Sequence, residues 1–581
     1  MINMTINNIK VAVKKNSTIL HAANKIGIKI PTLCHMELSC FDIDHTTGSC
    51  RICVVEVEGR KNLAPACCTP VMEGMVVRTN TIRSINARRT LLDLLLSDHP
   101  KDCLTCEKNG NCELQKLAAE MDLHHVLYEG KQSTYDIDLS SKSIVRDLDK
   151  CIMCRRCETA CNKMQTVGIL SGVGRGFNAV VAPAAMRPLT DTKCTFCGQC
   201  VAVCPVGALT EMNYKYDVWR ALNDKTKTVI VQTAPAVRVA IGEEFGMAPG
   251  SIATGKLVAG LKLLGFDKVF DTDFAADLTI MEETTELIER LTKKQNLPIL
   301  TSCCPGWVKF LEHQFPNLVY MPSTAKSPQQ MFGAIAKSYY AEKIGKKPED
   351  IVVVSVMPCL AKKYEASREE FSHDGVKDVD IVISTRELAD MFKEAGILID
   401  HLEPAEYDNP LGESTGAGVI FGASGGVMEA ALRYVSEKLN GAPMNNLNFK
   451  AVRGNATRRE ATLTIAGRQV SVAIVHGLEN ARKLITEQKA GKCKFDFIEV
   501  MACPGGCIAG AGQPITHSKK VREQRTTGIY NADKTMQLQK SQDNYMVEQC
   551  YRQHLGGCSG CETAHHTLHT GYTDRSAIFK A

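Results

Sequence analysis

The 581-residue chain lacks the features that mark several large classes of protein. Its longest uncharged stretches, such as residues 415–428, fall short of the roughly 18 apolar residues that span a membrane. The N-terminal run MINMTINNIK has neither an apolar signal segment nor a twin arginine. The net charge is only +5, without the concentrated basic charge of nucleic-acid-binding proteins. We therefore expect a cytoplasmic protein with no membrane span and no nucleic-acid partner.

Nucleotide-binding motifs are also missing. The chain has no P-loop, and the glycine-rich run 172–176 follows no expected strand and has the wrong spacing for a dinucleotide-binding fold. A second run, 422–426, does follow an expected strand, but close packing explains its glycines better than phosphate binding. Any flavin or nicotinamide site is therefore expected on a partner subunit.

What the chain does have is 26 cysteines. A chain of this length does not need disulfides to compensate for a small core, and their clustered spacing favours ligands or catalysis. Two CxxCxxCxxxC runs lie within residues 151–204, and the second ends in proline. In this bacterial [4Fe–4S] spacing the fourth cysteine binds the other cluster, whereas zinc would favour two CxxC pairs at longer separation. The predicted sets are Cys151, Cys154, Cys157 and Cys204 for one cluster, and Cys194, Cys197, Cys200 and Cys161 for the other.

Two further groups precede these runs. The first group lies within residues 34–67 and has a CxxC core, which predicts a [2Fe–2S] cluster. The gap between its first two cysteines is longer than in plant ferredoxins. Cys40 and Cys68 are alternatives for single positions there, and we interpret them as bystanders. The second group lies within residues 99–112 and could be a Cys₃His zinc site by ligand type. Its position between two predicted cluster domains instead favours a [4Fe–4S] cluster that extends an electron path. The two sets are Cys34, Cys50, Cys53 and Cys67, and His99, Cys103, Cys106 and Cys112.

Three cysteine groups lie in the C-terminal half: TSCCPGW (301–307), VMPCLAKKYE (356–365) and MACPGGCIAG (501–510). Each follows an expected strand. Because loops at the carboxyl ends of parallel strands converge on a ligand crevice, four thiolates from these loops would form one more cluster site. The alternative, buried structural cysteine, is disfavoured by the flanking Pro and Gly, which hold tight turns.

The pattern predicts a multidomain protein of the α+β and α/β classes. Alternating residues predict strands at 9–13 and 52–57, with a helix after Thr18, and residues 80–125 are expected to be helical. Short β-rich runs then alternate with helices, which indicates largely parallel strands; they are 228–231, 299–302, 351–356, 418–421, 470–475 and 497–500. The predicted domains are a β-grasp [2Fe–2S] domain (1–80), a His–Cys₃ [4Fe–4S] domain (81–125), a two-[4Fe–4S] ferredoxin-like domain (126–214), a large α/β domain (215–530) and a tail (531–581).

The three C-terminal groups and the cluster domains together resemble the iron-only ([FeFe]) hydrogenases, in the long form that carries accessory clusters. The similarity extends over about residues 1–530, and the combination of TSCCPGW, MPCxxKKxE and MACPGGCxxG is highly specific. The first 210 residues are also similar to the iron–sulfur part of the largest hydrophilic subunit of respiratory complex I. Among hydrogenases, the chain looks closest to the catalytic subunit of electron-bifurcating, NAD- and ferredoxin-dependent enzymes.

The resemblance implies an H-cluster, in which a [4Fe–4S] cluster is linked to a diiron centre with CO, cyanide and azadithiolate, and therefore implies maturation proteins. It places the cluster on Cys304, Cys359, Cys503 and Cys507, with Cys507 bridging to the diiron centre. Lys362 would hold a cyanide. Ala236 stands where ferredoxin-dependent members often have serine, which fits the bifurcating subgroup better. The other residues implied to line the diiron pocket are Pro235, Gln329, Met357, Phe421, Gly422 and Met501.

A helical run places Glu283, Glu286 and Arg290 on one face. From the residues alone, a solvated charged face is the ordinary interpretation. The resemblance instead matches Cys303, Glu283, Ser323, Glu286 and Arg290 to the family's proton relay, in which Cys303 must remain a free thiol. Partial burial would raise the pKa of the glutamates towards neutrality, as proton transfer requires.

These observations predict reversible oxidation of H₂ to protons and electrons, with electrons relayed through one [2Fe–2S] and three accessory [4Fe–4S] clusters. The expected partners are ferredoxin and flavin/NAD-binding and small [2Fe–2S] subunits. Alternatives are a stand-alone ferredoxin hydrogenase, a non-catalytic H₂ sensor and a complex-I-like electron-transfer subunit. In the tail, Cys550, His554, Cys558 and Cys561 could bind a metal at a subunit contact, but we prefer free surface thiols.

Overall fold

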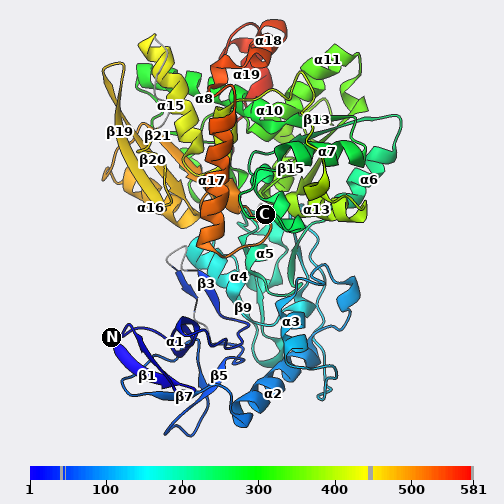
Figure 1. Ribbon diagram of the computed structural model, residues 1–581. Coiled ribbons are helices and arrows are strands. Elements are labelled where there is room, and N and C mark those ends of the chain that lie inside the picture. Colours follow the sequence, from blue (N-terminus) through cyan, green and yellow to red (C-terminus); the bar gives the residue numbers. More distant parts are fainter. Residues whose placement is uncertain (39–42, 46–47, 442–448, 578–581) are drawn as a thin grey trace.

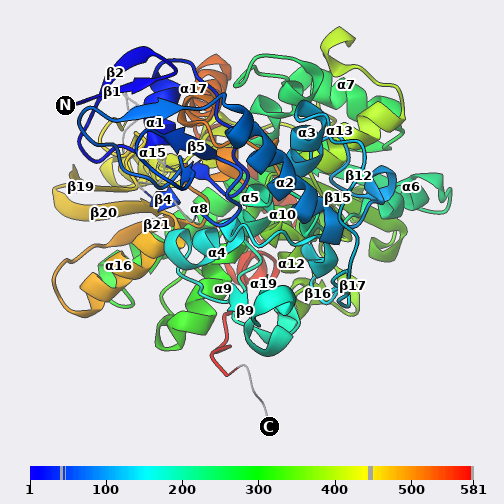
Figure 2. The same ribbon diagram turned by 90° about the horizontal axis from the view of Figure 1, so that it is seen from below.

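The computed structural model describes residues 1–38, 43–45, 48–441 and 449–577. The parts of the chain follow one another in space in sequence order. In Figure 1 the N-terminal part (blue) lies at the bottom, the cysteine-rich segment (cyan) in the middle and the large C-terminal part (green to red) at the top. Figure 2, seen from below, shows helix α2 (Ile82–Asp98) on the same face as the N-terminal sheet. Of the described helices, none is both long and apolar enough to cross a membrane.

The N-terminal part is a small mixed sheet with one helix. Helix α1 (Ile19–Lys25) begins after Thr18, whose side chain accepts a hydrogen bond from the His21 N–H, so this predicted helix start is confirmed. Cys40 lies outside the described residues. The order of strands in the sheet is β2 (Ile9–Val13), β1 (Ile2–Ile6), β7 (Val76–Arg78), β5 (Val54–Val57) and β6 (Ala64–Pro65). Within this sheet only the β1–β7 pair is parallel. A separate antiparallel pair is formed by β3 (Met36–Leu38) and β4 (Ile43–His45).

The middle part is built around the two cysteine runs. Each run enters a short helix at its third cysteine, so the sequence repeat is also a structural repeat. Helices α2 and α3 (Glu113–Glu120) confirm the helical prediction for 80–125 in part. The other elements are α4 (Arg156–Thr159), α5 (Gln199–Val203) and two antiparallel pairs, β8 (Ile144–Arg146) with β11 (Leu209–Glu211) and β9 (Ser171–Val173) with β10 (Val180–Ala182).

The large part contains two four-stranded sheets, parallel except for one edge strand. Helix α8 (Thr272–Lys293) lies between them and contributes side chains to the cores on both sides. The first sheet has the order β13 (Lys268–Asp271), β12 (Thr228–Thr233), β15 (Ile351–Met357) and β18 (Ile381–Ser384). The second has the order β14 (Ile299–Leu300), β21 (Phe497–Met501), β20 (Arg468–His476) and antiparallel β19 (Arg458–Ile465).

Further helices flank the two sheets, some on their outer faces and some beside α8 between them (Figure 1). They are α6 (Lys215–Asn223), α7 (Thr254–Leu264), α9 (Pro305–Gln314), α10 (Pro328–Ile335), α11 (Ala341–Ile344), α12 (Ala361–Glu365), α13 (Thr385–Glu394), α15 (Gly426–Asn440), α16 (Leu478–Lys489) and α17 (Lys519–Thr535).

Two expectations differ from this structure. The strand predicted at 418–421 is wrong, because α14 (Gly416–Val419) and a 3₁₀ turn occupy that segment. Its residues are all buried, and a short buried apolar run does not distinguish strand from helix. The predicted boundary after residue 530 falls inside α17. Beyond it, α18 (Tyr545–Gln553) and α19 (Glu562–Leu568) pack into the core of the large part, so this segment is not a loose tail.

Candidate active site

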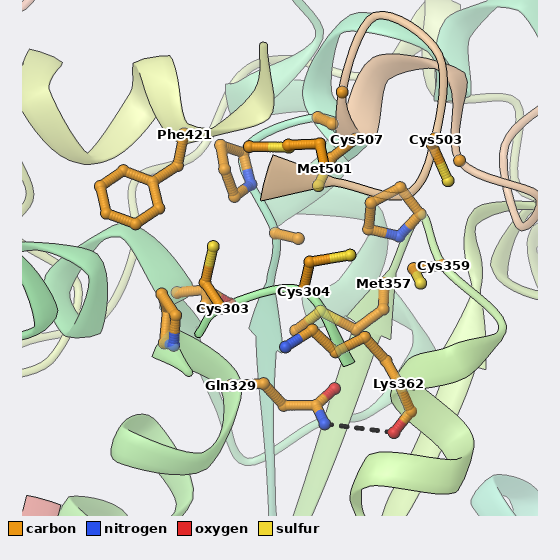
Figure 3. Close-up of a pocket in the computed structure, with 18 of the residues that line it drawn as sticks. Cys303, Cys304, Gln329, Met357, Cys359, Lys362, Phe421, Met501, Cys503 and Cys507 are labelled. Atoms are coloured by element: carbon orange, nitrogen blue, oxygen red, sulfur yellow. Dashed lines mark hydrogen bonds between the residues drawn. The ribbon is translucent and has the colours of Figure 1, made fainter. Parts of the chain in front are cut away.

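Three cysteine loops from the two sheets meet at one place. Cys304 follows β14 and immediately precedes α9, Cys359 follows β15, and Cys503 and Cys507 follow β21. The parallel strands direct all three loops to the same edge, as the sequence predicted. Figure 3 shows the four thiols on one side of a common pocket. Their convergence favours a shared ligand site over the alternative of buried structural cysteine.

The pocket is lined by nearly every residue that the sequence placed there. Gly422 is the exception, since it lies behind Ala236: a Cβ at Gly422 would stand 3.4 Å from the Ala236 Cβ and 2.9 Å from Ile529 Cδ1. Its role is close packing behind the pocket wall. The lining includes Pro235, Ala236, Cys303, Cys304, Gln329, Met357, Cys359, Lys362, Phe421, Met501, Cys503 and Cys507.

The chemistry of the four converging thiols fits an iron–sulfur cluster. Burial, followed by the neighbouring Cys304 thiol, raises the pKa of Cys507 to about 12. Burial and then Cys359 raise the pKa of Cys503 well above its ordinary value. Thiols with raised pKa values stay protonated near neutral pH, whereas a bound metal centre deprotonates coordinating thiols outright. The donor set therefore suits a cationic metal core.

Lys362 and Gln329 are held in place by a residue that the sequence interpretation missed. The Glu365 carboxylate is buried and accepts hydrogen bonds through Oε2 from Lys362 Nζ (2.8 Å), Gln329 Nε2 (3.1 Å) and Ser327 Oγ (3.0 Å). Burial lowers the pKa of Lys362, but Glu365 more than offsets this and the net shift is upward. Glu365 thus keeps a protonated amine at the pocket wall. Its i,i+3 spacing from Lys362 was the available sequence signal.

The predicted relay residues lie on the buried side of α8. Ser323 Oγ donates to Glu286 Oε2 at 2.8 Å, and Arg290 pairs with the other oxygen of Glu286. Glu283 is 2% exposed, and its Oε1 is buried without a hydrogen-bond partner. Burial and then Glu286 raise the pKa of Glu283 to about 8. Burial and then Glu283 raise the pKa of Cys303 well above its usual range. A solvated face is therefore excluded for Glu283.

We expect Glu283→Gln to make the protein more resistant to unfolding at alkaline pH. The native pKa of Glu283 is about 8, above its unfolded value, so its contribution to stability is fully present below the unfolded pKa and is lost as pH rises through about 8. The wild type should therefore lose up to a few kcal/mol relative to the glutamine variant between about pH 5 and 9. Denaturant unfolding of apoprotein at both pH values checks this. A constant difference between the two proteins would contradict the buried-acid interpretation.

Comparison with known proteins shows the family of the chain. The model for "Iron only hydrogenase large subunit, C-terminal domain" matches residues 227–511. The chain is 54% identical to NADP-reducing hydrogenase subunit HndD of Solidesulfovibrio fructosivorans, with full coverage of both chains. It is 39% identical to iron hydrogenase 1 of Clostridium pasteurianum, over 98% of this chain and all of that protein. The chain belongs to the iron-only ([FeFe]) hydrogenase family.

Further similarities agree with this membership. A solved variant of [FeFe]-hydrogenase HydA1 from Chlamydomonas reinhardtii matches with a TM-score of 0.57 and 42% identity, covering 62% of this chain and 99% of that one. This hydrogenase interconverts H₂ with protons and electrons and relays the electrons through iron–sulfur clusters. Other matching models are a 2Fe-2S cluster binding domain (1–82), an NADH-ubiquinone oxidoreductase-G iron-sulfur binding region (88–126), a 4Fe-4S binding domain (190–210) and an iron hydrogenase small subunit (519–575).

The hydrogenase brings the cysteines of its two central runs together in a crossed arrangement. Burial and then Cys204 raise the pKa of Cys154 to about 12. Burial, followed by Cys197, Cys194 and then Cys161, raises the pKa of Cys200 well above its ordinary value. The fourth cysteine of each run thus lies beside the first three of the other run.

The two runs also share a backbone conformation suited to an anionic cluster. Met153 and Phe196, each two residues after a first cysteine, have φ values of 52°. Arg155 (φ 61°) and Gly198 (φ 74°) each follow a second cysteine. Left-handed residues in a turn direct successive N–H groups into one concavity, which binds anions.

Four thiols of the N-terminal part are in mutual contact. The Cys34 N–H donates to Cys50 Sγ at 3.4 Å, and the Cys67 N–H donates to Cys53 Sγ at 3.5 Å. The Cys67 thiol is buried and contacts Cys34 and Cys53, and these contacts raise its pKa. Cys68 is exposed and directs its sulfur towards Pro65 O. This geometry favours Cys67 over Cys68.

His99 caps the C-terminus of α2 and is partly buried. Burial and then Lys150 lower its pKa, and its Nδ1 is buried without a hydrogen-bond partner. Burial raises the pKa of Cys112, and Cys106 and Cys103 add to this, so the three thiols lie near one another. A neutral imidazole with a buried, unpaired nitrogen is in the form that binds a metal.

The ferredoxin-like segment packs directly against the active-site pocket. Gln199 Nε2 donates to Cys503 Sγ at 3.3 Å. A Cβ on Gly306, in the first turn of α9, would lie 3.6 Å from the Cys197 Cβ. Gly198 is also closely packed, since a Cβ there would stand 2.7 Å from both Ala511 Cβ and Leu360 Cδ1. The two cysteine sites therefore touch, which suits electron transfer between them.

We expect Gly198→Ala to destabilise this contact. The added methyl overpacks the interface, which costs about 1–3 kcal/mol in addition to the strain of a left-handed alanine. Gly168→Ala is the matched control, because Gly168 has nearly the same φ (75°) but no heavy atom within 4 Å of its Cβ position. Thermal unfolding of the two variants measures the difference. Equal midpoints would contradict the close approach.

The tail cysteines lie in different surroundings. Cys550 is fully buried in the core of the large part, whereas Cys558 is exposed and the Cys561 thiol donates to Leu555 O. Within the described ranges, no three His, Cys, Asp or Glu side chains surround a point closely enough for a single metal ion. Thiolates of a cluster stand farther apart, since each binds a different iron. The metal hypothesis for the tail thus lacks support, and the surface-thiol interpretation is wrong for Cys550.

Proposed function

We propose that this hydrogenase is the H₂-converting subunit of an electron-bifurcating complex, with ferredoxin and a nicotinamide nucleotide as electron partners. The name of its 54% identical relative, an NADP-reducing hydrogenase subunit, supports both a multi-subunit assembly and a nicotinamide acceptor. The sequence supplies no nucleotide-binding motif of its own, so a flavin/NAD-binding subunit and a small [2Fe–2S] subunit would complete the complex. NAD and NADP are both compatible with this proposal.

The proposed cofactors are one [2Fe–2S] cluster, three accessory [4Fe–4S] clusters and the H-cluster. The mutual contacts of the thiols described above support each set. The proposed ligands are Cys34, Cys50, Cys53 and Cys67; His99, Cys103, Cys106 and Cys112; Cys151, Cys154, Cys157 and Cys204; Cys161, Cys194, Cys197 and Cys200; and Cys304, Cys359, Cys503 and Cys507. Because His99 takes the place of a fourth thiolate, its cluster carries one negative charge less. The reduction potential of that cluster should therefore be raised.

When bound, the diiron centre would supply the metal chemistry that splits or forms H₂. The chain's own contribution is to orient this centre, to exclude water and to move protons. Lys362, held by Glu365, presents a positive charge and N–H donors to the pocket. Cys303 stays a neutral thiol because burial and Glu283 oppose its ionisation. It can therefore give up one proton and take another without leaving a net charge in the pocket.

The proposed proton relay runs from Cys303 through Glu283 and Ser323 to Glu286 and Arg290. The single observation that supports it most is the raised pKa of Glu283, about 8, because efficient proton transfer needs a group that titrates near the working pH. A non-catalytic sensor would not need this set, so its presence favours catalysis.

The complex is tested by purifying the anaerobically matured assembly. H₂ turnover is measured with ferredoxin alone, with NAD⁺ or NADP⁺ alone, and with both acceptors together. Bifurcation predicts substantial turnover only when both acceptors are present. Turnover of the isolated chain with ferredoxin alone would instead identify a stand-alone ferredoxin hydrogenase.

A further inference from the structure

The outer end of the proposed relay lacks an obvious group that exchanges protons with solvent. Arg290 pairs with Glu286 there, but a guanidinium remains protonated under all ordinary conditions and cannot release a proton. Glu286 itself is only 14% exposed, and its Oε2 accepts hydrogen bonds from Ser323 Oγ and the Thr324 N–H. Glu286 borders a surface cavity but is held by these donors, so a neighbouring side chain that reaches the same cavity could carry protons between Glu286 and solvent.

A chain of hydrogen bonds leads away from Glu286 to a histidine. The Thr324 hydroxyl lies 3.4 Å from Glu286 Oε2 and 2.7 Å from His569 Nδ1. On its other side, His569 Nε2 lies 3.0 Å from Glu282 Oε2. The sequence pattern assigned no role to Glu282, in the run that forms α8, and His569 lies 287 residues away near the C-terminus. An imidazole is the side chain best suited to exchange protons near neutral pH.

The surroundings of Glu282 fix the orientation of the imidazole. This carboxylate is fully buried and accepts hydrogen bonds from the Tyr551 hydroxyl and the Gly560 N–H (3.0 Å). With donors on both oxygens, Glu282 acts as an acceptor for the Nε2–H of His569. In that tautomer Nδ1 carries the lone pair and faces the Thr324 hydroxyl, so it can accept a proton from the side of Glu286.

His569 also borders solvent. It lines a surface cavity of about 570 Å³, together with Glu282, Glu286 and His565. The exposed His565 ring stacks on the His569 ring, with centroids 4.4 Å apart and planes inclined by 12°. The His569 side chain is 5% exposed. It is therefore ordered by its buried partners and reachable from the cavity.

We propose that His569 carries protons between Glu286 and solvent, with Thr324 as the bridging hydroxyl and Glu282 as the positioning residue. This inference rests on the proposed relay and extends it by one branch.

The transfer is balanced without any electron movement. On the way out, the O–H bond of protonated Glu286 breaks and its proton binds Thr324 Oγ1. The hydroxyl proton of Thr324 moves to His569 Nδ1. The products are a Glu286 carboxylate, an unchanged threonine and an imidazolium. Its ring then turns away from Thr324, the Nδ1–H bond breaks to release the proton to water in the cavity, and the ring returns with the Nδ1 lone pair facing the hydroxyl. H₂ production uses the same steps in reverse.

Substitution of His569 and Thr324 tests the branch in the matured full chain with a dye as electron partner. His569→Gln and Thr324→Val should each lower H₂ turnover by about 10-fold or more, since positioned proton carriers contribute at least this much. Thr324→Ser keeps the hydroxyl and should retain turnover. His566→Gln is the matched control, because His566 is an exposed neighbour on α19 outside the hydrogen-bond chain.

Added imidazole separates proton carriage from a structural role. The cavity admits a small buffer molecule, so imidazole should restore turnover to His569→Gln in a concentration-dependent way, and should not restore it to Thr324→Val. The pH profile of turnover should change in His569→Gln. The groups that face His569 and shape this profile are Glu282, Glu286 and Arg290 from α8, Tyr551 from α18 and His565 from α19.

A measurement on apoprotein completes the test without any turnover. The ¹⁵N resonances of the His569 imidazole should show the proton on Nε2, and Glu282→Gln, which removes the negatively charged acceptor, should change that tautomer preference. Wild-type turnover in His569→Gln, or a loss that imidazole does not restore, would overturn the branch. If Cys303→Ser also kept full turnover, the relay itself would be wrong; if only the branch variants did, the relay would stand.

Discussion

Cys303→Ser is expected to lower H₂ turnover by at least about 10²-fold, the range that a positioned proton donor contributes. Cys303 lines the active-site pocket, and burial together with Glu283 keeps its thiol neutral. Serine has nearly the same shape, but its hydroxyl is a much weaker acid, so the proton step adjacent to the diiron centre should slow. The cluster ligand Cys304 is unchanged, and cofactor insertion should therefore survive. H₂ uptake with a dye measures the loss.

Cys493→Ser is the matched control for this substitution. Cys493 is another free, partly buried cysteine, but it contacts Gln488 and does not line the pocket. Its replacement should leave turnover unchanged. If Cys303→Ser retained full turnover with a fully loaded H-cluster, Cys303 would not be the proton donor.

Glu365→Gln is expected to produce a loss of similar size, about 10²-fold or more in turnover. The Glu365 carboxylate binds Lys362 and Gln329 at the pocket wall. Removal of one partner of a buried ion pair leaves the other charge uncompensated, at a cost of about 3–5 kcal/mol. Lys362 should then deprotonate or turn away, and the pocket loses a charged donor of the kind worth about 10²–10³-fold in rate.

The infrared spectrum distinguishes this effect from misfolding. The frequencies of the metal-bound cyanide bands should shift in Glu365→Gln, because the contact from Lys362 changes, while the CO bands remain present. Glu369→Gln provides the control, since Glu369 is an exposed carboxylate four residues away. Unchanged turnover and unchanged cyanide bands would show that Lys362 does not depend on Glu365.

The convergence of the cysteine loops could be predicted from the sequence because its parts are encoded locally, whereas the other pocket residues were implied only by the family resemblance. Each cysteine loop follows a strand, and parallel strands direct their carboxyl-end loops to one edge. The relay residues Glu283, Glu286 and Arg290 share a helical face by spacing alone. The spacing of CxxCxxCxxxC also predicted the crossed approach of Cys161 and Cys204 to the opposite run.

Other features depend on tertiary packing that local pattern does not encode. The buried segment 418–421 is apolar throughout, so its sequence period could not separate strand from helix. His569 contacts Glu282 although the two residues are 287 positions apart in the sequence, so no local pattern predicts the contact. The family resemblance implied that Gly422 lines the pocket. It lies behind Ala236 instead, because Ile529 of α17 packs against it. In the same way, burial of Cys550 was hidden within a segment of polar composition.

Infrared spectroscopy of the anaerobically matured chain tests the central claim most directly, namely that the loops of Cys304, Cys359 and Cys503–Cys507 hold an H-cluster. The account predicts bands of metal-bound CO and cyanide in the wild type, and their loss in Cys507→Ser, while the accessory clusters remain visible by electron paramagnetic resonance. A fully matured wild-type chain without these bands, or a Cys507→Ser variant with unaltered bands, would contradict it.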